Sequence, residues 1–305
     1  MRYAILELCT PAELASMAAL NRAPGPSTRW RHSKVASFVA SNPGSTVDGM
    51  VQARYDAVAE FYIEGFDSID DPASRGLLDL LGPVAGLQVV DVACGHGRIT
   101  RELARRGASV VGIDLSGALI GRARDAEQDE QLGIRYLHGD VTTPGALDGF
   151  DGGFDVAACN FGLSDIDNLD AAIAAISAAL KPRGRFAFSI VHPCFAGGTD
   201  ISGSWPAAGS YYDEGHWTAQ GIRSGLRRLV GANHRTLSTY LATLRRHGLW
   251  LDELAEPLPP PGWDPAHDAD RQPVFLVAQC VKLSDPAMLP AGTGDPHQVQ
   301  PPASD

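Results

Sequence analysis

The stretch VVDVACGHGRIT, residues 89–100, decides how the rest of the chain is interpreted. The nearly continuous apolar run over residues 87–94 is typical of a parallel strand that is covered on both faces. Residues 98–107 have apolar side chains at helical spacing and end at a glycine. Gly95 and Gly97, in the turn between them, let backbone amides approach a ligand closely, beside the positive end of a helix. The stretch therefore predicts a strand, a ligand-binding turn and a helix.

The same alternation of strand and helix continues along the chain. Further strands are predicted over residues 108–116, 133–140, 154–160 and 185–193, and helices over residues 116–130 and 169–184. Two final apolar segments, residues 249–257 and 274–283, are joined by a proline-rich loop instead of a helix, so the last strand is expected to be antiparallel to its neighbour. The pattern predicts an α/β fold with a doubly wound, seven-stranded, mostly parallel, Rossmann-like sheet.

The regions outside this alternation have different compositions. Val51, Tyr55, Val58 and Tyr62 fall near helical spacing, which predicts an amphipathic helix, and a helix is also expected over residues 232–248. The predicted divisions are an N-terminal arm or cap (1–45), a helical cap (46–75), the main domain (76–283) with an insert rich in Gly, Trp and Tyr (194–232), and a disordered tail (284–305).

Composition narrows the class of protein. The formal net charge is −11, from 36 acidic and 25 basic residues, which is poorly suited to binding a phosphate backbone. Arg223, Arg227 and Arg228 lie close together and are interpreted as a solvated helix face. Five scattered cysteines without a CxxC pair favour neither disulfides nor a zinc site, so no metal is expected. No signal-peptide or membrane-span pattern is found, and a cytoplasmic location without a membrane partner is predicted.

Acidic residues mark the ends of three successive predicted strands. A dinucleotide site would require G-x-G-x-x-G, but Ala93 precedes the glycine pair and Thr100 takes the place of the third glycine. Asp91 would repel a pyrophosphate and suits a ligand that carries an amine. Asp114, roughly 20 residues further on, can accept from two ribose hydroxyls, and Asp140 can accept from an exocyclic adenine amine. The three acids describe a ligand with an amine, a ribose and an adenine but no phosphate, and S-adenosylmethionine fits this description.

The segments DVACGHGRIT, VVGIDLS, HGD and FDVAACN resemble the successive motifs of class I S-adenosylmethionine-dependent methyltransferases, over about residues 50–283. More loosely, the chain resembles a small-molecule, type 11-like subgroup. The resemblance implies S-adenosylmethionine as cofactor, S-adenosylhomocysteine as product, and a helical cap over the cofactor. Ala93 departs from the many members with glycine there, and alanine is compatible with the motif if its φ is negative. The implied cofactor-binding residues are Tyr55, Asp91, Ala93, Gly95, Gly97, Asp114, Leu115, Asp140, Val141, Asn160 and Phe161.

The second half of the chain is expected to hold the methyl acceptor. His192, at the end of the fifth strand, and His234 are candidate general bases, although either could be a structural histidine. Tyr62, in the segment that closes over the cofactor, is a third candidate catalytic residue. Asp165 is interpreted as a loop acid. Four aromatic residues of the insert could either line a planar acceptor or pack a lid: Trp205, Tyr211, Tyr212 and Trp217.

These observations predict in-line methyl transfer to a small-molecule acceptor, with an aromatic or heterocyclic compound of specialised metabolism as the suggested substrate. A monomer or homodimer without a nucleic-acid partner is expected. Two alternatives stay open. One is a nucleic-acid (RNA base) methyltransferase, with Cys194 as a nucleophile in the manner of the RNA cytosine-5 enzymes that share the fold. The other is a cofactor-binding protein without catalysis. An NAD dehydrogenase is the rival at the level of the fold.

Overall fold

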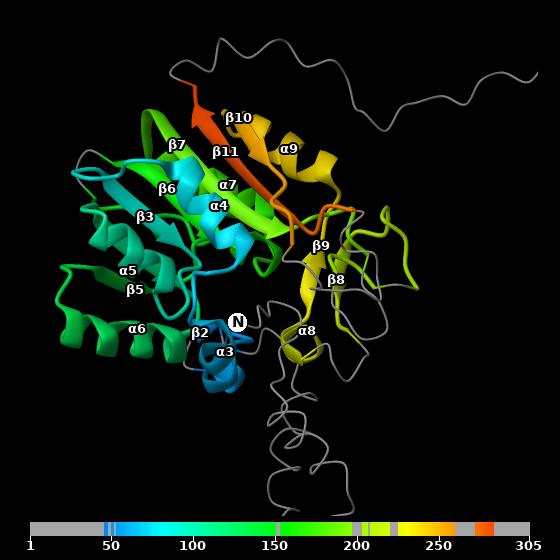
Figure 1. Ribbon diagram of the computed structural model, residues 1–305, viewed down its shortest axis with the longest axis horizontal. Helices are drawn as coiled ribbons and strands as arrows, with labels where there is room; N and C mark the ends of the chain where they lie inside the picture. Colours follow the sequence, from blue (N-terminus) through cyan, green and yellow to red (C-terminus); the bar gives the residue numbers. More distant parts are fainter. Residues whose placement is uncertain are drawn as a thin grey trace, which may run out of the picture.

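A seven-stranded sheet forms the centre of the molecule, in the order β10-β11-β7-β6-β3-β4-β5 (Figure 1). In the computed structural model the described residues are 46–47, 50–51, 53–150, 153–196, 203–206, 208–219, 225–259 and 272–283. The strands of the sheet are β3 (Gln88–Val92), β4 (Ser109–Asp114), β5 (Arg135–His138), β6 (Phe154–Asn160), β7 (Leu180–Val191), β10 (Leu249–Ala255) and β11 (Phe275–Lys282). β11 is antiparallel to both β7 and β10, and the remaining pairs are parallel. The predicted doubly wound sheet with an antiparallel last strand is confirmed.

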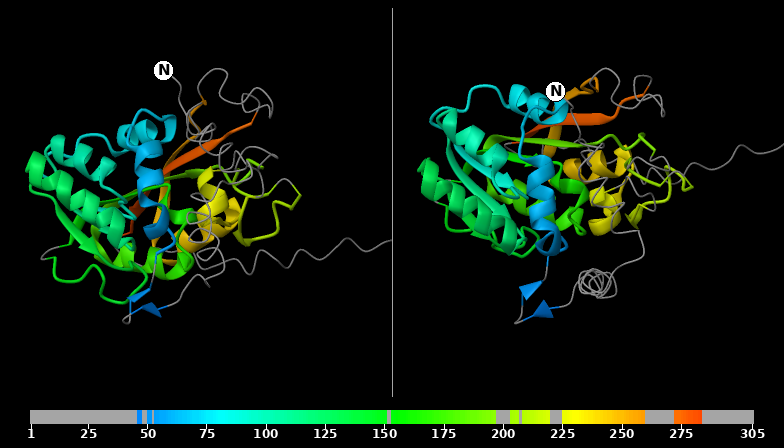
Figure 2. Two further views of the ribbon diagram at one scale, coloured as in Figure 1. Left: turned by 90° about the horizontal axis from the view of Figure 1, so that it is seen from below. Right: turned by 60° about the horizontal axis from the view of Figure 1, so that its bottom comes forward.

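Helices cover both faces of this sheet (Figures 1 and 2). One layer contains α4 (Pro72–Leu81), α5 (Arg98–Arg105) and α6 (Gly117–Glu130), and the other contains α7 (Leu169–Ala179) and α9 (Leu237–Arg246). Val89 packs in the cluster with α4 and α5, whereas Val90 and Val92 pack in the cluster with α7 and α9. Because side chains of a strand alternate between faces, burial on both sides requires the continuous apolar run in the sequence.

Two predicted helices are shorter than expected, because residues at one end of each form strand pairs with distant parts of the chain. The helix predicted over residues 169–184 ends at Ala179, and the chain from Leu180 onward belongs to β7, where Leu180 pairs with Phe154 of β6. The helix predicted over residues 232–248 starts at Leu237, since residues 232–234 form β9 (Ala232–His234) against β8 (Gly215–Trp217). Local spacing alone does not show these pairings.

The segment before the sheet also differs from the prediction. Met50–Val51 form β2 and pair with β1 (Thr46–Val47), so the helical part consists of η1 (Asp56–Val58) and α3 (Ala59–Phe66), together called the cap here. Helix α4 was not predicted at all. The remaining short elements are η2 (Gly162–Ser164) and α8 (Gly225–Val230). The predicted arm (1–45) and tail (284–305) lie outside the described residues, so both stay predictions.

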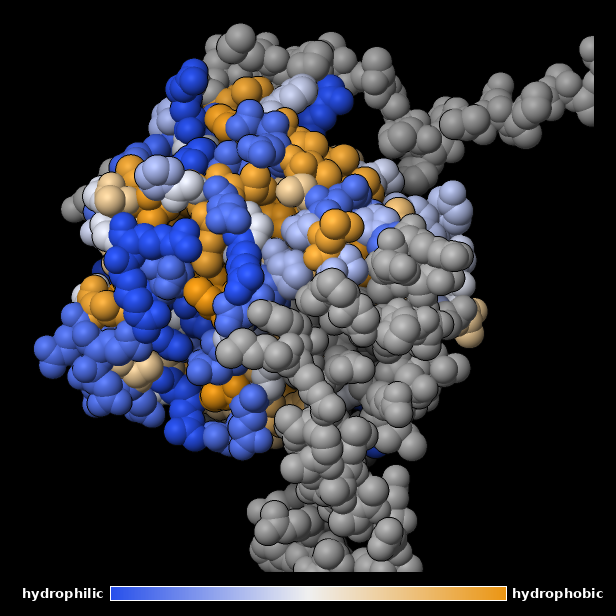
Figure 3. Space-filling view, viewed as in Figure 1, coloured by the Kyte–Doolittle hydropathy of each residue, from blue (hydrophilic) through white to orange (hydrophobic). Residues whose placement is uncertain are grey.

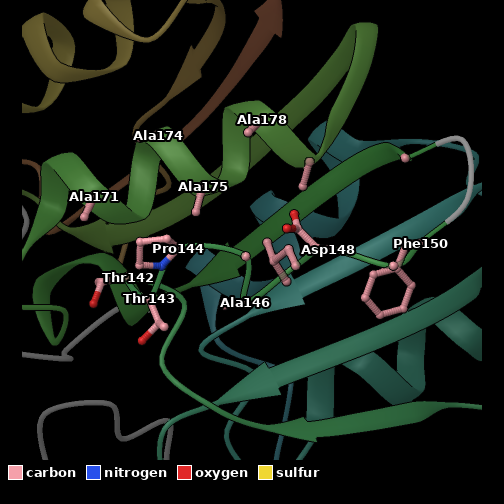
Figure 4. Close-up of a pocket in the computed structure, with 15 residues that line it drawn as sticks. Thr142, Thr143, Pro144, Ala146, Asp148, Phe150, Ala171, Ala174, Ala175 and Ala178 are labelled. Carbon is pink, nitrogen blue, oxygen red and sulfur yellow. The ribbon is translucent and has the colours of Figure 1, made fainter.

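Between β5 and β6, the described residues 139–150 and 153 contain no helix, which is unusual for a parallel crossover. A groove of 590 Å³ opens there between the loop of residues 142–150 and the alanine-rich side of α7 (Figure 4). The small side chains of Ala171, Ala175 and Ala178 leave this space open. None of the predicted site residues lines the groove, although Thr142, which does, donates two hydrogen bonds to Asp140.

The outer surface of α5 and α6 is hydrophilic (Figure 3). Arg105 pairs there with Glu130, and Arg106 pairs with Glu102 at 2.9 Å. Among the described residues, no helix combines the length and the apolar character that a membrane crossing needs.

Asp71 at the start of α4 provides a test of how this layer is held. Its carboxylate accepts from the backbone N–H of Ser74 at 2.7 Å and from Arg98 at 3.1 Å, and the Asp71 and Arg98 side chains are each 7% exposed. Asp71→Ala is expected to lower the free energy of unfolding by about 3 kcal/mol, because it removes the helix cap and leaves a buried guanidinium without its carboxylate. Denaturant unfolding followed by circular dichroism measures this change.

Asp70→Ala is the matched control. The carboxylate of Asp70 pairs with Arg75 in solvent, where the two side chains are 55% and 57% exposed. Its unfolding curve is expected to match that of the wild type, since exposed ion pairs contribute little. Equal losses in the Asp70 and Asp71 variants would contradict the role given to the buried pair.

Candidate active site

The turn between β3 and α5 depends on two glycines in the left-handed region of backbone conformation. Gly95 has φ 58° and Gly97 has φ 84°. A Cβ atom added to Gly97 would lie 2.3 Å from the hydroxyl oxygen of Tyr136, whereas the nearest atom to a Cβ on Gly95 is Cε1 of Tyr62, at 3.6 Å. Packing therefore excludes any side chain at Gly97. At Gly95 the backbone faces Tyr62 of the cap, so this glycine borders the space that a ligand would use.

Ala93 also lies in the left-handed region, with φ 54°. The condition of a negative φ, under which alanine would fit the motif without strain, is therefore not met. This conformation costs alanine roughly 1–2 kcal/mol. The turn imposes it, because the backbone N–H of Cys94 is bound by the carbonyl of Ile113 at 3.1 Å. Gly162 provides room for the methyl group, since a Cβ at Gly162 would lie only 2.4 Å from that of Ala93.

Asp114 joins the glycine turn to the next helix. Its two carboxylate oxygens accept from the backbone N–H of Gly95 at 2.7 Å and from that of Ser116 at 2.8 Å. A carboxylate has about four lone-pair positions, so half of its acceptor capacity is left. Burial raises the pKa of Asp114 to about 6, although the hydrogen bonds from Ser116 and Gly95 oppose this shift. A carboxylate in this state is suited to two further hydroxyl donors.

Asp91 and Asp140 lie near the ends of the strands on either side of β4. Asp91 is 1% exposed and accepts from the hydroxyl of Thr100 at 2.6 Å. Asp91 is buried beneath the turn, so it could act on a ligand only through the turn. The same burial raises the pKa of Asp91 to about 7. One oxygen of Asp140 accepts from the backbone N–H and the hydroxyl of Thr142. Val141, next to it, is buried, and the carbonyl of Leu115 is 3.1 Å from the ring of His138.

The cap is fixed at both of its ends. At its start, Asp56 accepts from the hydroxyl of Ser116 at 2.6 Å and from the backbone N–H of Ala118 at 3.1 Å, at the beginning of α6. Beyond its end, Asp67 lies 3.3 Å from the ring of His96 and 3.6 Å from Arg101. The cap thus bridges the first turns of α6 and α5, above the glycines.

Tyr62 occupies the middle of the cap. Its ring stacks on Phe66 at 4.9 Å and meets Tyr55 and His96 edge-on at 5.2 and 5.6 Å. Burial raises the pKa of Tyr62 to about 12, so its hydroxyl is protonated at neutral pH and can donate a hydrogen bond but cannot accept a proton. This geometry favours a role in binding over the predicted role as a catalytic residue.

Asn160 and Phe161 lie at the end of β6. The side-chain oxygen of Asn160 accepts from Ser189 at 2.7 Å, and its amide group donates to Ser74 at 3.0 Å. Phe161 has φ 60° and meets Phe275 edge-on. The Asn160 side chain therefore connects β6 to β7 and α4, while the left-handed turn at Phe161 directs the following loop toward the cap.

Both candidate histidines are engaged at both ring nitrogens. Nδ1 of His192 accepts from the backbone N–H of Cys194 at 3.0 Å, and Nε2 is 3.0 Å from Glu256. Burial lowers the pKa of His192, so the ring is neutral and its proton lies on Nε2. Nε2 of His234 donates to the carbonyl of Tyr211 at 2.8 Å, and its Nδ1 is 3.2 Å from the hydroxyl of Ser204. No lone pair is left for a substrate proton, which favours the structural role for both residues.

Three of the four predicted aromatic residues hold the insert together. Trp205 donates to the carbonyl of Pro193 at 3.0 Å, and Trp217 donates to that of Ser204 at 2.8 Å. The hydroxyl of Tyr211 accepts from a backbone N–H at the start of α9, at 2.9 Å. Tyr212 is 82% exposed. The polar atoms of Trp205, Tyr211 and Trp217 therefore hold the insert to its surroundings, and a role of their rings beside an acceptor stays a prediction.

Sequence reasoning missed an ion pair beside the cap. Asp165 accepts from the hydroxyl of Tyr55 at 2.9 Å and pairs with Arg227, whose side chain is 13% exposed. The interpretation of Arg227 as part of a solvated helix face is wrong, and Asp165, interpreted as a loop acid, is its carboxylate partner; Arg228 is exposed, and Arg223 lies outside the described residues. The partners of Asp165 are 110 and 62 residues away in the chain, so no local pattern indicates either contact.

Comparison with known proteins agrees with this geometry. Residues 89–184, which run from β3 through the glycine turn into β7, match a family model described as a methyltransferase domain. The chain carries a class I S-adenosylmethionine-dependent methyltransferase domain. A solved S-adenosylmethionine-dependent methyltransferase from Mesorhizobium loti is 27% identical, with a TM-score of 0.56 over 70% of this chain and 99% of that chain.

Two further matches show how far the likeness extends beyond this domain. The ubiquinone biosynthesis O-methyltransferase of Methylococcus capsulatus is 34% identical over 109 residues, which are 36% of this chain and 45% of that protein. The match thus spans less than half of that relative. A Burkholderia thailandensis 1,6-didemethyltoxoflavin-N1-methyltransferase, solved with that compound and S-adenosylhomocysteine, shares the fold at 17% identity and a TM-score of 0.50, over 86% of this chain and 93% of that chain.

The two glycines of the methyltransferase turn are expected to respond differently to alanine. Gly95→Ala should lower the free energy of unfolding by about 1–2 kcal/mol, the strain of a left-handed alanine. Gly97→Ala should lower it by about 3 kcal/mol or more, because its Cβ would also overlap the Tyr136 ring. Thermal unfolding of the two variants makes the comparison.

Tyr136→Phe provides the control for the second effect. The Tyr136 hydroxyl is buried without a hydrogen-bond partner, so its removal alone should not destabilise the protein. In the Gly97→Ala background it removes the nearest clashing atom and should restore part of the loss. No recovery in the double variant would show that Tyr136 is not what excludes a side chain at Gly97.

Proposed function

We propose that this protein transfers the methyl group of S-adenosylmethionine to a small-molecule acceptor. The observation that carries the proposal is the carboxylate of Asp114, which lies at the carboxyl end of β4 with two acceptor positions left and with the glycine turn as its neighbour. Ligands of doubly wound sheets bind at this edge, and an acid at the end of the second strand is suited to a ribose. The family match over residues 89–184 supports the same cofactor.

Each part of the cofactor would meet residues of matching chemistry. Asp114 would accept from the ribose hydroxyls, and Asp140 would accept from the adenine amine. The turn at Gly95 would lie along the methionine part, with Tyr62 of the cap above it. Asp91 would add negative charge beneath the turn, toward the amino group. The bound cofactor supplies an electrophilic methyl group on a sulfonium, and the residues of the chain bind it, orient it and exclude water.

The acceptor would bind between the end of β6, the cap and the insert. Two relatives are named as a ubiquinone biosynthesis O-methyltransferase and a demethylmenaquinone methyltransferase, and both names indicate a small-molecule acceptor. This supports a small and aromatic acceptor here. Because the two histidines of this region are fully hydrogen-bonded, an acceptor that is nucleophilic without a histidine base suits the site best. Positioning of acceptor and methyl group can supply about 7–11 kcal/mol of the barrier in favourable cases.

The structure offers little support for the alternative of an RNA base methyltransferase. Partial burial and the charge of Glu256 raise the pKa of the Cys194 thiol, which opposes the thiolate that a nucleophile requires. The net charge of −11 also opposes a polyanionic substrate.

Calorimetric titration with S-adenosylhomocysteine tests the cofactor. The wild type is expected to bind, and Asp114→Asn should weaken binding at least about tenfold, because the amide accepts fewer hydrogen bonds and carries no charge. Asp125→Asn, on the exposed side of α6, is the matched control and should bind like the wild type. Equal affinity in the wild type and Asp114→Asn would sink the proposed role of Asp114. Transfer of labelled methyl to a panel of phenols, amines and enols then tests the reaction.

The affinity is also expected to depend on pH. The pKa of Asp114 is about 6 in the free protein, and hydroxyl donors favour its ionised form. Affinity should therefore be full well above pH 6 and fall as the pH drops through 6, by up to about tenfold per unit. Titrations between pH 5 and 8 measure the slope. Asp114→Asn should remove this component, and any slope left near pH 7 is assigned to Asp91.

A further inference from the structure

We propose that Asp165 is a positioning residue that couples the cap to the insert, so that closure over the cofactor also orders the acceptor side. This role rests on the proposed function. Asp165 lies in the loop after β6, between the cap and α8, which are neighbours in Figures 1 and 2. It receives one contact from each of these two elements.

The two oxygens of the Asp165 carboxylate have different partners. Oδ2 accepts at 2.9 Å from the hydroxyl of Tyr55, the residue directly before the cap. Oδ1 accepts from Nη1 of Arg227 in α8, which also donates to the carbonyl of Gly231 at 2.9 Å. A movement of either element therefore changes the hydrogen bonds of the same carboxylate.

Neighbouring contacts strengthen the same three-way junction. Arg54, next to Tyr55, donates to the backbone carbonyl of Asp165 at 2.5 Å and to the carboxylate of Asp167 at 3.0 Å. From β9, directly after the insert, Asn233 donates to the carboxylate of Asp167 at 2.9 Å. Arg235 binds the carbonyls of residues 163, 166 and 167. The loop after β6 is thus held from the cap on one side and from the insert on the other.

The ion pair between Asp165 and Arg227 makes this contact between cap, loop and α8 sensitive to the loss of either residue. Arg227 is largely shielded from solvent, and Asp165 is its carboxylate partner, so loss of either leaves an uncompensated charge beside the site. Tyr62 and Asp114 both lie near enough to Asp165 for its charge to add to the effect of burial on their pKa values. The junction therefore lies beside the residues proposed to hold the cofactor.

A double-variant cycle in cofactor binding tests this coupling. S-adenosylhomocysteine is the probe, titrated by calorimetry into the wild type, Tyr55→Phe, Arg227→Met and the double variant. Each single variant is expected to weaken binding about fivefold to tenfold, within the range of ordinary coupling between sites. The double variant should be no more than about tenfold weaker than the wild type, because both changes act through Asp165. Arg228→Met, an exposed neighbour on α8, is the control and should bind within twofold of the wild type.

Arg227→Lys keeps the positive charge and should recover most of the affinity that Arg227→Met loses, which a purely steric role of this side chain would not give. Thermal unfolding without ligand confirms that each variant is folded; if Arg227→Met is not, Arg227→Gln, which also removes the charge, takes its place in the cycle. Independent, multiplying effects of the two single changes, or wild-type affinity in Arg227→Met, would overturn the role of Asp165 while leaving the proposed function intact. A wild type that does not bind the probe overturns both.

Discussion

The two hydrogen bonds that Asp114 accepts from the backbone of Gly95 and Ser116 connect β4 to the glycine turn and to the start of α6. The rest of the site depends on this connection. One bond fixes the turn after β3, and the other fixes the first turn of α6. Ser116 also caps α6 and donates its hydroxyl to Asp56 of the cap. A single strand-end carboxylate therefore sets the positions of the turn, the helix and the cap that faces them.

This arrangement has an energetic cost for the folded protein. Burial raises the pKa of Asp91 to about 7 and that of Asp114 to about 6, both above the usual value for an aspartate. Because these pKa values are higher in the folded state than in the unfolded chain, the folded state binds protons more readily. The two acids therefore oppose folding most at high pH and less as the pH falls from 7 toward 4. Acids that are held ionised without full compensation are typical of sites that bind cationic or hydroxyl-rich ligands.

Backbone strain is found at the carboxyl edge of the sheet, beside the site. Ala93 and Phe161 have positive φ at the ends of β3 and β6, where the chain must turn sharply next to the site. Away from this edge, the described residues of the crossover from β5 to β6 contain no helix, and the alanines of α7 leave an open groove there. The core above and below the sheet remains continuous in spite of this gap, because β6, β7 and β11 are covered by α4 on one face and by α7 and α9 on the other.

Much of this protein could be predicted from local sequence. The apolar runs of the strands, the glycine turn and Asp114 at a strand end were all identified correctly, because they follow from burial on both faces and from backbone conformations that glycine alone adopts easily. The helix predicted from residue 116 does start there, with Ser116 accepting from the backbone N–H of Leu119, because a helix start is also a local hydrogen-bonding problem. The antiparallel last strand followed from the absence of a crossover helix.

Contacts between distant parts of the chain required the tertiary structure. Only the fold shows that the ring nitrogens of His192 and His234 are occupied, that residues 180–184 extend a strand, and that Arg227 leaves the surface to pair with Asp165. Sequence by itself determined the central part of each strand in the main sheet and that Asp114 ends one of them, because those properties depend on neighbours a few positions away. The tertiary structure alone decided which polar groups are already satisfied, because their partners lie tens of residues away and no periodicity connects them.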